Sequence, residues 1–193
     1  MKFPRQANAS GLNLYLIGFM GVGKSAVGRS VARQLGMRFL DSDAEIEASE
    51  GRSISDIFAD EGETAFRGKE RAFIETGHPP QGVVVACGGG LPIPAGMREL
   101  LLSKGIVVCL FANPDTILER TLGSDKRPLL RTEDPLERVR ALLAEREPIY
   151  MQTGIGVCAE GRSLSEVVRN VVRVYRREAS SRKQSAAPAQ RTS

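Results

Sequence analysis

The chain has 193 residues, of which 41% are hydrophobic and 26% are charged, and its formal net charge is +4. This length suits one domain with a well-buried core and excludes two large domains. Because no run approaches the roughly 20 apolar residues that span a bilayer and residues 1–11 lack the apolar core of a secretory signal, we expect a cytoplasmic protein without a membrane partner.

The first informative segment joins a strand to a helix. Residues 12–17 are an apolar run that predicts a strand, and Val27, Val31 and Leu35 have the spacing of a helix over residues 26–35. Between them, Gly18 and Gly23 are separated by four residues and followed at once by Lys and Ser. This is the P-loop pattern in its required strand-loop-helix context, which favours phosphate binding over an ordinary glycine turn.

Each position of this loop has a physical use in binding a nucleoside triphosphate with magnesium. Backbone amides and the helix N-terminus attract phosphate oxygens, Lys24 neutralises terminal-phosphate charge, and the Ser25 hydroxyl suits Mg²⁺. The residues expected to bind the nucleotide here are Gly21, Val22, Gly23, Lys24, Ser25 and Ala26.

Two acids follow the next short strand, residues 38–40, and precede a helix that begins near Ala44. The strands over 83–87 and 106–111 end without an acid, whereas Asp41 directly follows residues 38–40, so Asp41 is the candidate magnesium ligand, directly or through water. Asp43 is placed to face an acceptor hydroxyl. Capping of the following helix is the alternative for this pair, and the neighbouring P-loop favours the functional interpretation.

Further helices are predicted from about Ser55 to a break at Gly62 and over residues 63–76. Arg67 lies on the second of these helices, four residues after Glu63 and three before Glu70. By itself this spacing favours a surface ion pair.

A strand over residues 83–87 then leads into three glycines, Gly88, Gly89 and Gly90. They could form a flexible turn, but their place after a strand favours a backbone that approaches a ligand closely. A helix over 95–103, a strand over 106–111 and a helix over 114–122 follow.

The polar segment 123–132 contains Arg127 and predicts a mobile lid, which could deliver a cation to a moving phosphoryl group; an exposed basic loop is the alternative. An amphipathic helix follows, with Arg146 near its end at the Pro148 boundary, where pairing with the helix dipole is the simplest role.

The chain closes with a strand over 155–159, a helix over 163–177 and a tail. Residues 169–193 contain seven basic residues and one acidic residue, a local charge of +6 that leaves −2 for the rest. Because residues 178–193 are poor in apolar side chains, we expect a disordered, solvated tail. The chain has no Trp and no recognised nucleic-acid module, so no nucleic-acid partner is expected.

Alternating strands and helices predict an α/β fold, a three-layer α/β/α sandwich around a sheet of five parallel strands, over residues 12–177 with a flexible tail before it. Ligands of such sheets bind at the carboxyl ends of the strands. This rule brings the P-loop, the Asp41–Asp43 segment and the triple glycine to one edge.

Taken together, the motifs resemble the shikimate kinase family over residues 12–177. They are the P-loop, Asp41-Ser-Asp43, Asp56-Ile-Phe58 leading to Gly62-Glu63, Phe66-Arg67-x-x-Glu70, Gly88-Gly-Gly90, Arg127-Pro-Leu-Leu130 and Arg146-x-Pro148-x-Tyr150. The resemblance implies a nucleoside monophosphate kinase-like fold and a monomer that uses ATP, Mg²⁺ and shikimate. The reaction would phosphorylate the 3-hydroxyl of shikimate, a step toward chorismate and the aromatic amino acids.

The resemblance also implies roles for individual residues. Lys24, Asp43 and Arg127 would be catalytic, with Asp43 also binding the ring hydroxyls. Arg67 and Arg146 would clamp the substrate carboxylate, with backbone contacts from Gly88, Gly89 and Gly90, and Glu70 would orient Arg67. Arg120 and Arg162 would contact the nucleotide on its adenine side, and the lid arginine Arg127 would bind the nucleotide at the transferring phosphate.

Two alternatives remain open from the sequence. The P-loop cannot by itself choose an acceptor, so a gluconate or nucleoside monophosphate kinase is one of them. A silent nucleotide-binding homologue is the other, although the lysine and both acids are present.

Overall fold

The computed structural model describes residues 11–121 and 134–186 of the chain. Its five strands form one parallel sheet in the order β2-β3-β1-β4-β5. The strands are β1 (Asn13–Ile17), β2 (Arg38–Asp41), β3 (Val83–Ala86), β4 (Gly105–Phe111) and β5 (Ile155–Cys158). The predicted five-stranded parallel sheet is confirmed.

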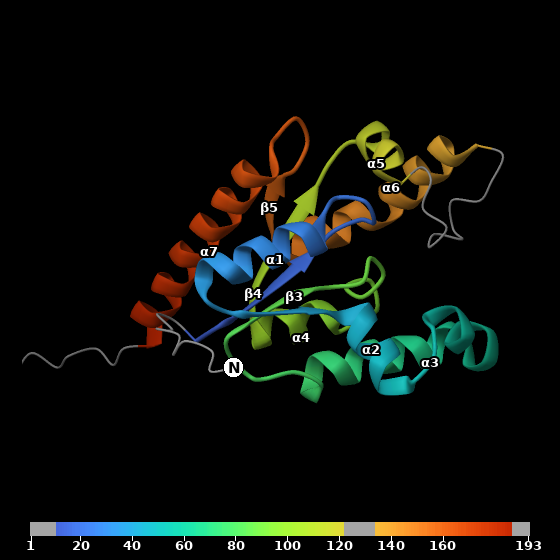
Figure 1. Ribbon diagram of the computed structural model, residues 1–193, viewed down its shortest axis with the longest axis horizontal. Helices are drawn as coiled ribbons and strands as arrows, with labels where there is room; N and C mark the ends of the chain where they lie inside the picture. Colours follow the sequence, from blue (N-terminus) through green and yellow to red (C-terminus); the bar gives the residue numbers. More distant parts are fainter. Residues whose placement is uncertain (1–10, 122–133, 187–193) are drawn as a thin grey trace, which may run out of the picture.

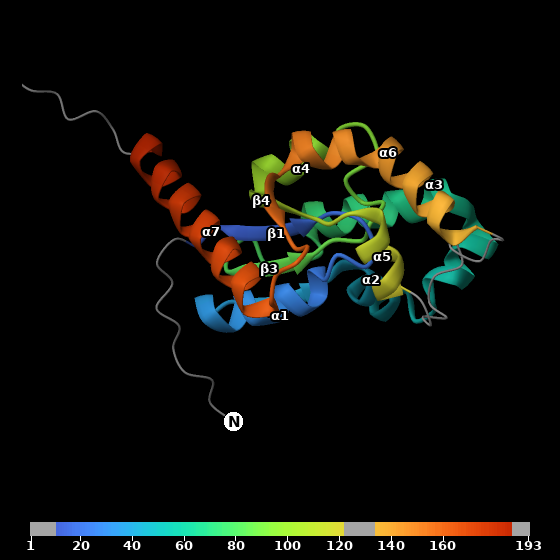
Figure 2. The same ribbon diagram turned by 90° about the horizontal axis from the view of Figure 1, so that it is seen from above.

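Helices cover both faces of this sheet. In the part of the chain that the structure describes they are α1 (Lys24–Leu35), α2 (Ser42–Glu50), α3 (Ile54–Thr76), α4 (Met97–Lys104), α5 (Pro114–Thr121), α6 (Pro135–Thr153) and α7 (Leu164–Ala186). Helix α1 lies on one side of β1, and α4 and α6 lie on the other (Figure 2). Helices α1 and α7 pack against each other. The α/β/α layering is therefore also as predicted.

The strands are continuous apolar runs because both of their faces are buried. Every residue of β1 and β3 is buried, as is every residue of β4 before Phe111, which is the pattern of a doubly covered parallel sheet. At the carboxyl ends of the strands, on the right of Figure 1, α5 and α6 lie on one side and α2 and α3 on the other. None of the helices described is long and apolar enough to cross a membrane.

The break expected at Gly62 is present inside α3. Gly62 has φ 79° and ψ 176°, so the helical backbone is interrupted there. This positive φ favours glycine, since a side chain would be strained in that region. The segment that carries Arg67 and Glu70 thus starts in a new direction after the kink.

The predicted end of the last helix at residue 177 is wrong. Helix α7 continues to Ala186, so residues 178–186 are helical and not part of a disordered tail. Ala179 is buried against the core, and the Arg182 guanidinium donates to the carbonyl oxygen of Leu102 at 3.4 Å. These contacts with the body of the domain extend the helix beyond its apolar sequence pattern.

The boundary expected at Pro148 is also wrong, because α6 runs through it to Thr153. Proline removes one backbone donor from the helix. Tyr150 and Thr153, beyond the proline, are both buried, and the Tyr150 hydroxyl bonds another segment of the chain. Tertiary packing therefore outweighs the lost hydrogen bond, and Arg146 lies within the helix, away from its C-terminal dipole.

Candidate functional site

The P-loop connects the central strand β1 to the N-terminus of α1. Gly21 and Gly23 have φ 80° and 96°, which allows the chain to curl tightly before the helix. The Lys24 ammonium donates to the carbonyl oxygens of Gly18 at 2.8 Å and Phe19 at 2.9 Å. A cation is thus held over a loop that ends at a helix N-terminus, an arrangement that favours phosphate.

Ser25 and Asp41 meet beside this loop. The Ser25 hydroxyl donates to Oδ2 of Asp41 at 2.7 Å. Asp41 precedes α2, but its side chain makes no capping hydrogen bond, so capping by Asp41 is not observed. Hydroxyl and carboxylate oxygens are ligands that Mg²⁺ prefers, usually together with waters and substrate phosphates. Within residues 11–121 and 134–186, no group of three or more metal-binding side chains forms an all-protein cage.

Asp43 lies in the first turn of α2, against the triple glycine. Burial and the Asp41 carboxylate raise the pKa of Asp43, and Lys24 acts in the opposite direction. A side chain at Gly88 would collide with Oδ1 of Asp43. The fully buried Ser42 hydroxyl accepts from the Gly88 amide at 2.8 Å and donates to Asp43 at 3.3 Å. Ser42 therefore fixes the carboxylate relative to the glycines.

Arg67 approaches the same glycines from α3. A Cβ at Gly90 would lie 2.5 Å from both terminal nitrogens of the Arg67 guanidinium. Arg67 donates to Glu63 at 2.8 Å and to Glu70 at 2.6 Å. Glu70 is only 1% exposed and Arg67 is partly buried, so this pair lies below the surface, unlike the surface pair that the spacing alone favours.

Arg146 reaches this region beside Tyr150, one turn further along α6. The buried Tyr150 hydroxyl donates to the carbonyl oxygen of Gly89 at 2.6 Å. Burial raises the pKa of Tyr150 to about 12, while the guanidiniums of Arg146 and Arg67 both lower it, so both cations act on the same phenol. Nε of Arg146 is buried and has no hydrogen-bond partner among the residues that the structure describes. The triple glycine thus contacts Asp43, Tyr150 and Arg67 in turn.

Of the expected adenine-side residues, Arg120 lies on α5 and donates to the carbonyl oxygen of Ala159 at 3.1 Å. This bond joins α5 to the loop after β5, where the exposed Arg162 lies. The lid over 123–132 and its Arg127 fall outside the described residues. The remaining expected residues collect at one edge of the sheet.

Two contributors to this site are not among the residues that the sequence singled out. Ser42 was named only as the middle of an acid pair, and its partner Gly88 is 46 residues away. Tyr150 was named only as part of a motif. Its spacing of four from Arg146 would have placed both on one helix face, had the helix been predicted to pass Pro148.

Glu70 gives the site a pH-dependent effect on stability. Burial raises the pKa of Glu70 to about 7, above its ordinary value of 4.5, against the opposing effect of Arg67. The native carboxyl thus binds its proton more tightly than the unfolded one, so the free energy of unfolding falls as pH rises from about 4.5 to about 7. We expect Glu70→Gln to abolish this decline. Thermal denaturation at about pH 5 and about pH 8, which lie near the two ends of this range, measures the effect. The Tm of the variant minus that of the unsubstituted protein should be higher at about pH 8 than at about pH 5.

Glu75→Gln is the control, because Glu75 pairs with Arg71 at the surface of the same helix. Its Tm difference from the unsubstituted protein should stay nearly constant between the two pH values. A constant difference for Glu70→Gln as well would contradict the raised pKa.

The fold and this site define an ATP-dependent phosphotransferase of the P-loop class. The family model described as shikimate kinase matches residues 20–176. The shikimate kinase of Deinococcus radiodurans is 46% identical over 157 residues, 81% of this chain and 80% of that protein. The chain belongs to the shikimate kinase family.

Other relatives agree. A shikimate kinase of Thermus thermophilus is 45% identical over 168 residues, 86% of this chain and 91% of that protein. The solved shikimate kinase from Acinetobacter baumannii in complex with shikimate superposes with a TM-score of 0.81 at 36% identity, covering 89% of this chain and 96% of that one. A gluconokinase from Sinorhizobium meliloti, with a TM-score of 0.63 and 20% identity, shares the fold alone.

Proposed function

We propose that this protein transfers the γ-phosphoryl group of ATP to the 3-hydroxyl of shikimate, giving ADP and shikimate 3-phosphate. The observation that carries the proposal is the convergence of one carboxylate and two guanidiniums around Gly88–Gly90, next to the P-loop. The names of the relatives support shikimate as the acceptor.

The two guanidiniums suit the carboxylate of the acceptor. Planar guanidinium forks can make paired hydrogen bonds to a carboxylate, which fixes its orientation as well as its charge. Nε of Arg146, which is buried and without a hydrogen-bond partner in the described ranges, supports a ligand at this place, since a buried donor without a partner is costly. Glu70 acts as a positioning residue that holds Arg67 toward Gly90.

Asp43 is the candidate for orienting the acceptor hydroxyl and accepting its proton. The hydroxyl oxygen attacks the γ-phosphorus as the bond to the β-phosphate oxygen breaks, and the proton passes to the Asp43 carboxylate. The raised pKa of Asp43 makes it a better proton acceptor than an exposed aspartate. Orientation of this kind supplies much of the catalysis in phosphoryl transfer.

The nucleotide would be held by residues 21–26, with Lys24 on its terminal phosphates, and by Arg120 and Arg162 on the adenine side. Arg127 would contact the transferring phosphoryl group. Ser25 and Asp41 would hold Mg²⁺, which neutralises charge that develops on the phosphate oxygens. We propose that the protein acts as a monomer, as the resemblance of its motifs to the family implies.

The clamp predicts a selective loss when Arg146 is replaced by Ala. We expect the KM for shikimate to rise about 100-fold, because a charge-assisted contact is removed and the substrate carboxylate loses a partner. The KM for ATP should change less than about twofold, since the P-loop contacts to the phosphates remain. Initial rates with each substrate varied in turn measure both constants.

Arg140→Ala is the matched control, since Arg140 lies on the same helix, is exposed, and pairs only loosely with Glu137 at 4.0 Å. It should leave both constants unchanged. An equal rise of both KM values in Arg146→Ala would contradict the clamp.

Tyr150→Phe removes the hydrogen bond to Gly89 that ties α6 to the glycine turn. We expect the KM for shikimate to rise about tenfold, because losing one buried hydrogen bond lets the glycines and Arg146 drift from their relative positions. The KM for ATP should be unaffected.

Tyr175→Phe controls for stability, because it removes a similar bond from a buried tyrosine to the Leu12 carbonyl oxygen at 2.8 Å. Both variants should lose a few degrees of Tm, but only Tyr150→Phe should affect shikimate. A similar KM change in both would show that Tyr150 acts only through stability.

A further inference from the structure

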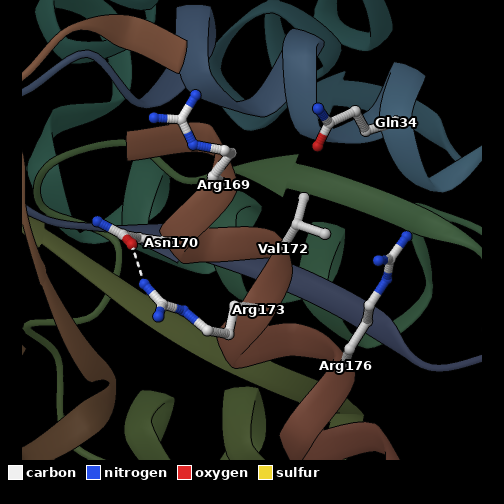
Figure 3. Close-up of a pocket in the computed structure, with 6 residues that line it drawn as sticks. All are labelled: Gln34, Arg169, Asn170, Val172, Arg173 and Arg176. Atoms are coloured by element: carbon white, nitrogen blue, oxygen red, sulfur yellow. Dashed lines mark hydrogen bonds between the residues drawn. The ribbon is translucent and has the colours of Figure 1, made fainter. Parts of the chain in front are cut away.

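A second concave region lies on the face where α1 and α7 pack together. It is open to solvent, has a volume of about 540 Å³ and is shown in Figure 3. Its lining residues are Gln34, Arg169, Asn170, Val172, Arg173 and Arg176, and we call it the α1–α7 groove. Gln34 is ten residues beyond Lys24 on α1, so the groove is roughly 15 Å from the P-loop and belongs to a different part of the molecule.

The spacing of the arginines directs two of them into this groove. Arg169 is three residues before Val172 and Arg176 is four after it, so the three share one face of α7. Figure 3 shows Arg169 and Arg176 extending toward α1 on either side of Val172, with Gln34 opposite. Arg173 turns instead to Asn170 and donates to its side-chain oxygen.

None of these cations forms a short ion pair in the described parts of the chain, and the acid that interacts with Arg169 electrostatically is Glu166, one turn before it on α7. Within residues 11–121 and 134–186, no carboxylate lies within 4.0 Å of the guanidinium of Arg169, Arg173 or Arg176. The acid nearest in sequence, Glu166, accepts from the Ser163 hydroxyl at 2.6 Å and from its amide at 2.8 Å. The groove therefore carries a concentrated positive charge.

We propose that the α1–α7 groove binds a small ligand with two or more phosphate groups, such as an oligophosphate or a bisphosphate. Guanidinium forks match phosphate oxygens, and about 540 Å³ is within the usual range for small-molecule sites. The Cα atoms of Arg169 and Arg176 are separated by roughly 10 Å along the helix, which suits separated phosphates better than a single one. The Gln34 amide adds a further donor from α1.

The composition of the groove favours a small ligand over a nucleic acid. None of its six lining residues is aromatic, whereas surfaces that bind single strands usually stack bases on aromatic rings. Five of the six lining residues have charged or amide side chains and the sixth, Val172, is nearly buried, so the recognition is by charge and amide groups. The proposal concerns a separate site and does not depend on the identity of the phosphoryl acceptor.

Calorimetric titration of the full chain with inorganic tripolyphosphate tests this proposal. Saturating ADP, shikimate and Mg²⁺ fill both the P-loop and the carboxylate clamp, and a titration of tripolyphosphate into the same solution without protein subtracts the heat of Mg²⁺ binding, so that only the groove is measured. We expect one equivalent to bind, and orthophosphate to bind much more weakly. The double variant Arg169→Gln, Arg176→Gln should weaken binding at least about tenfold while its Tm and ADP formation remain unchanged.

The matched control is Arg177→Gln with Lys183→Gln, which removes the same charge from α7 outside the groove. It should bind tripolyphosphate with nearly unchanged affinity. Absence of binding beyond the P-loop, or equal weakening in both double variants, would overturn the proposal. So would displacement of tripolyphosphate by lower concentrations of a short single-stranded oligonucleotide, which would indicate an extended nucleic-acid surface.

Discussion

Asp43→Asn is expected to lower kcat for shikimate phosphorylation by about 10³-fold. The amide keeps the size of the side chain and its place between Ser42 and Gly88, but it cannot accept the proton of the attacking hydroxyl. The KM for ATP should be nearly unchanged, because the P-loop is intact. Steady-state rates with both substrates varied measure these constants.

Asp60→Asn provides the control. Asp60 lies on the first part of α3, is exposed, and pairs with Arg52. It should not change kcat. If Asp43→Asn kept kcat within about tenfold of the unsubstituted enzyme, well short of the loss expected for a missing general base, Asp43 would have no part in proton transfer and the carboxylate would serve only to hold α2 against the glycines.

Lys24→Ala is expected to lower kcat by a similar factor, about 10³-fold. It removes the cation that lies on the P-loop carbonyl oxygens, and with it the charge that stabilises the transferring phosphoryl group. Rapid-quench measurement of one turnover at saturating ATP separates this loss from weaker nucleotide binding.

Lys69→Ala removes a lysine that pairs with Glu50 at 2.8 Å and Glu61 at 3.2 Å, away from the P-loop. Its single-turnover rate should equal that of the unsubstituted enzyme. Normal phosphoryl transfer by Lys24→Ala would mean that the loop does not bind the reacting nucleotide.

Local sequence patterns were sufficient for the architecture. Short apolar runs between amphipathic helices predict a buried parallel sheet, and this topology places every loop after a strand at one edge. The P-loop, the acid pair and the triple glycine could therefore be assigned to one site without coordinates. The kink at Gly62 was also predictable, because glycine tolerates its positive φ.

The errors occur where distant contacts decide the local structure. Helix α6 passes Pro148 because Tyr150 is anchored on Gly89, 61 residues away. Helix α7 continues past residue 177 because Ala179 and Arg182 contact the body of the domain. The roles of Ser42 and of the buried Glu70 pair also depend on partners brought close only by the fold. A sequence pattern over a few residues contains no information about such contacts.

The measurement that tests the central claim most directly is ADP formation from ATP and Mg²⁺ by the purified full chain, with shikimate, gluconate, a nucleoside monophosphate or no acceptor. The proposal predicts ADP release that depends on shikimate. NMR of the product should show the phosphorus bonded to the 3-oxygen. Release with gluconate or a nucleotide but not with shikimate would contradict the carboxylate clamp, and tight ATP binding without release for any acceptor would contradict the catalytic assignment.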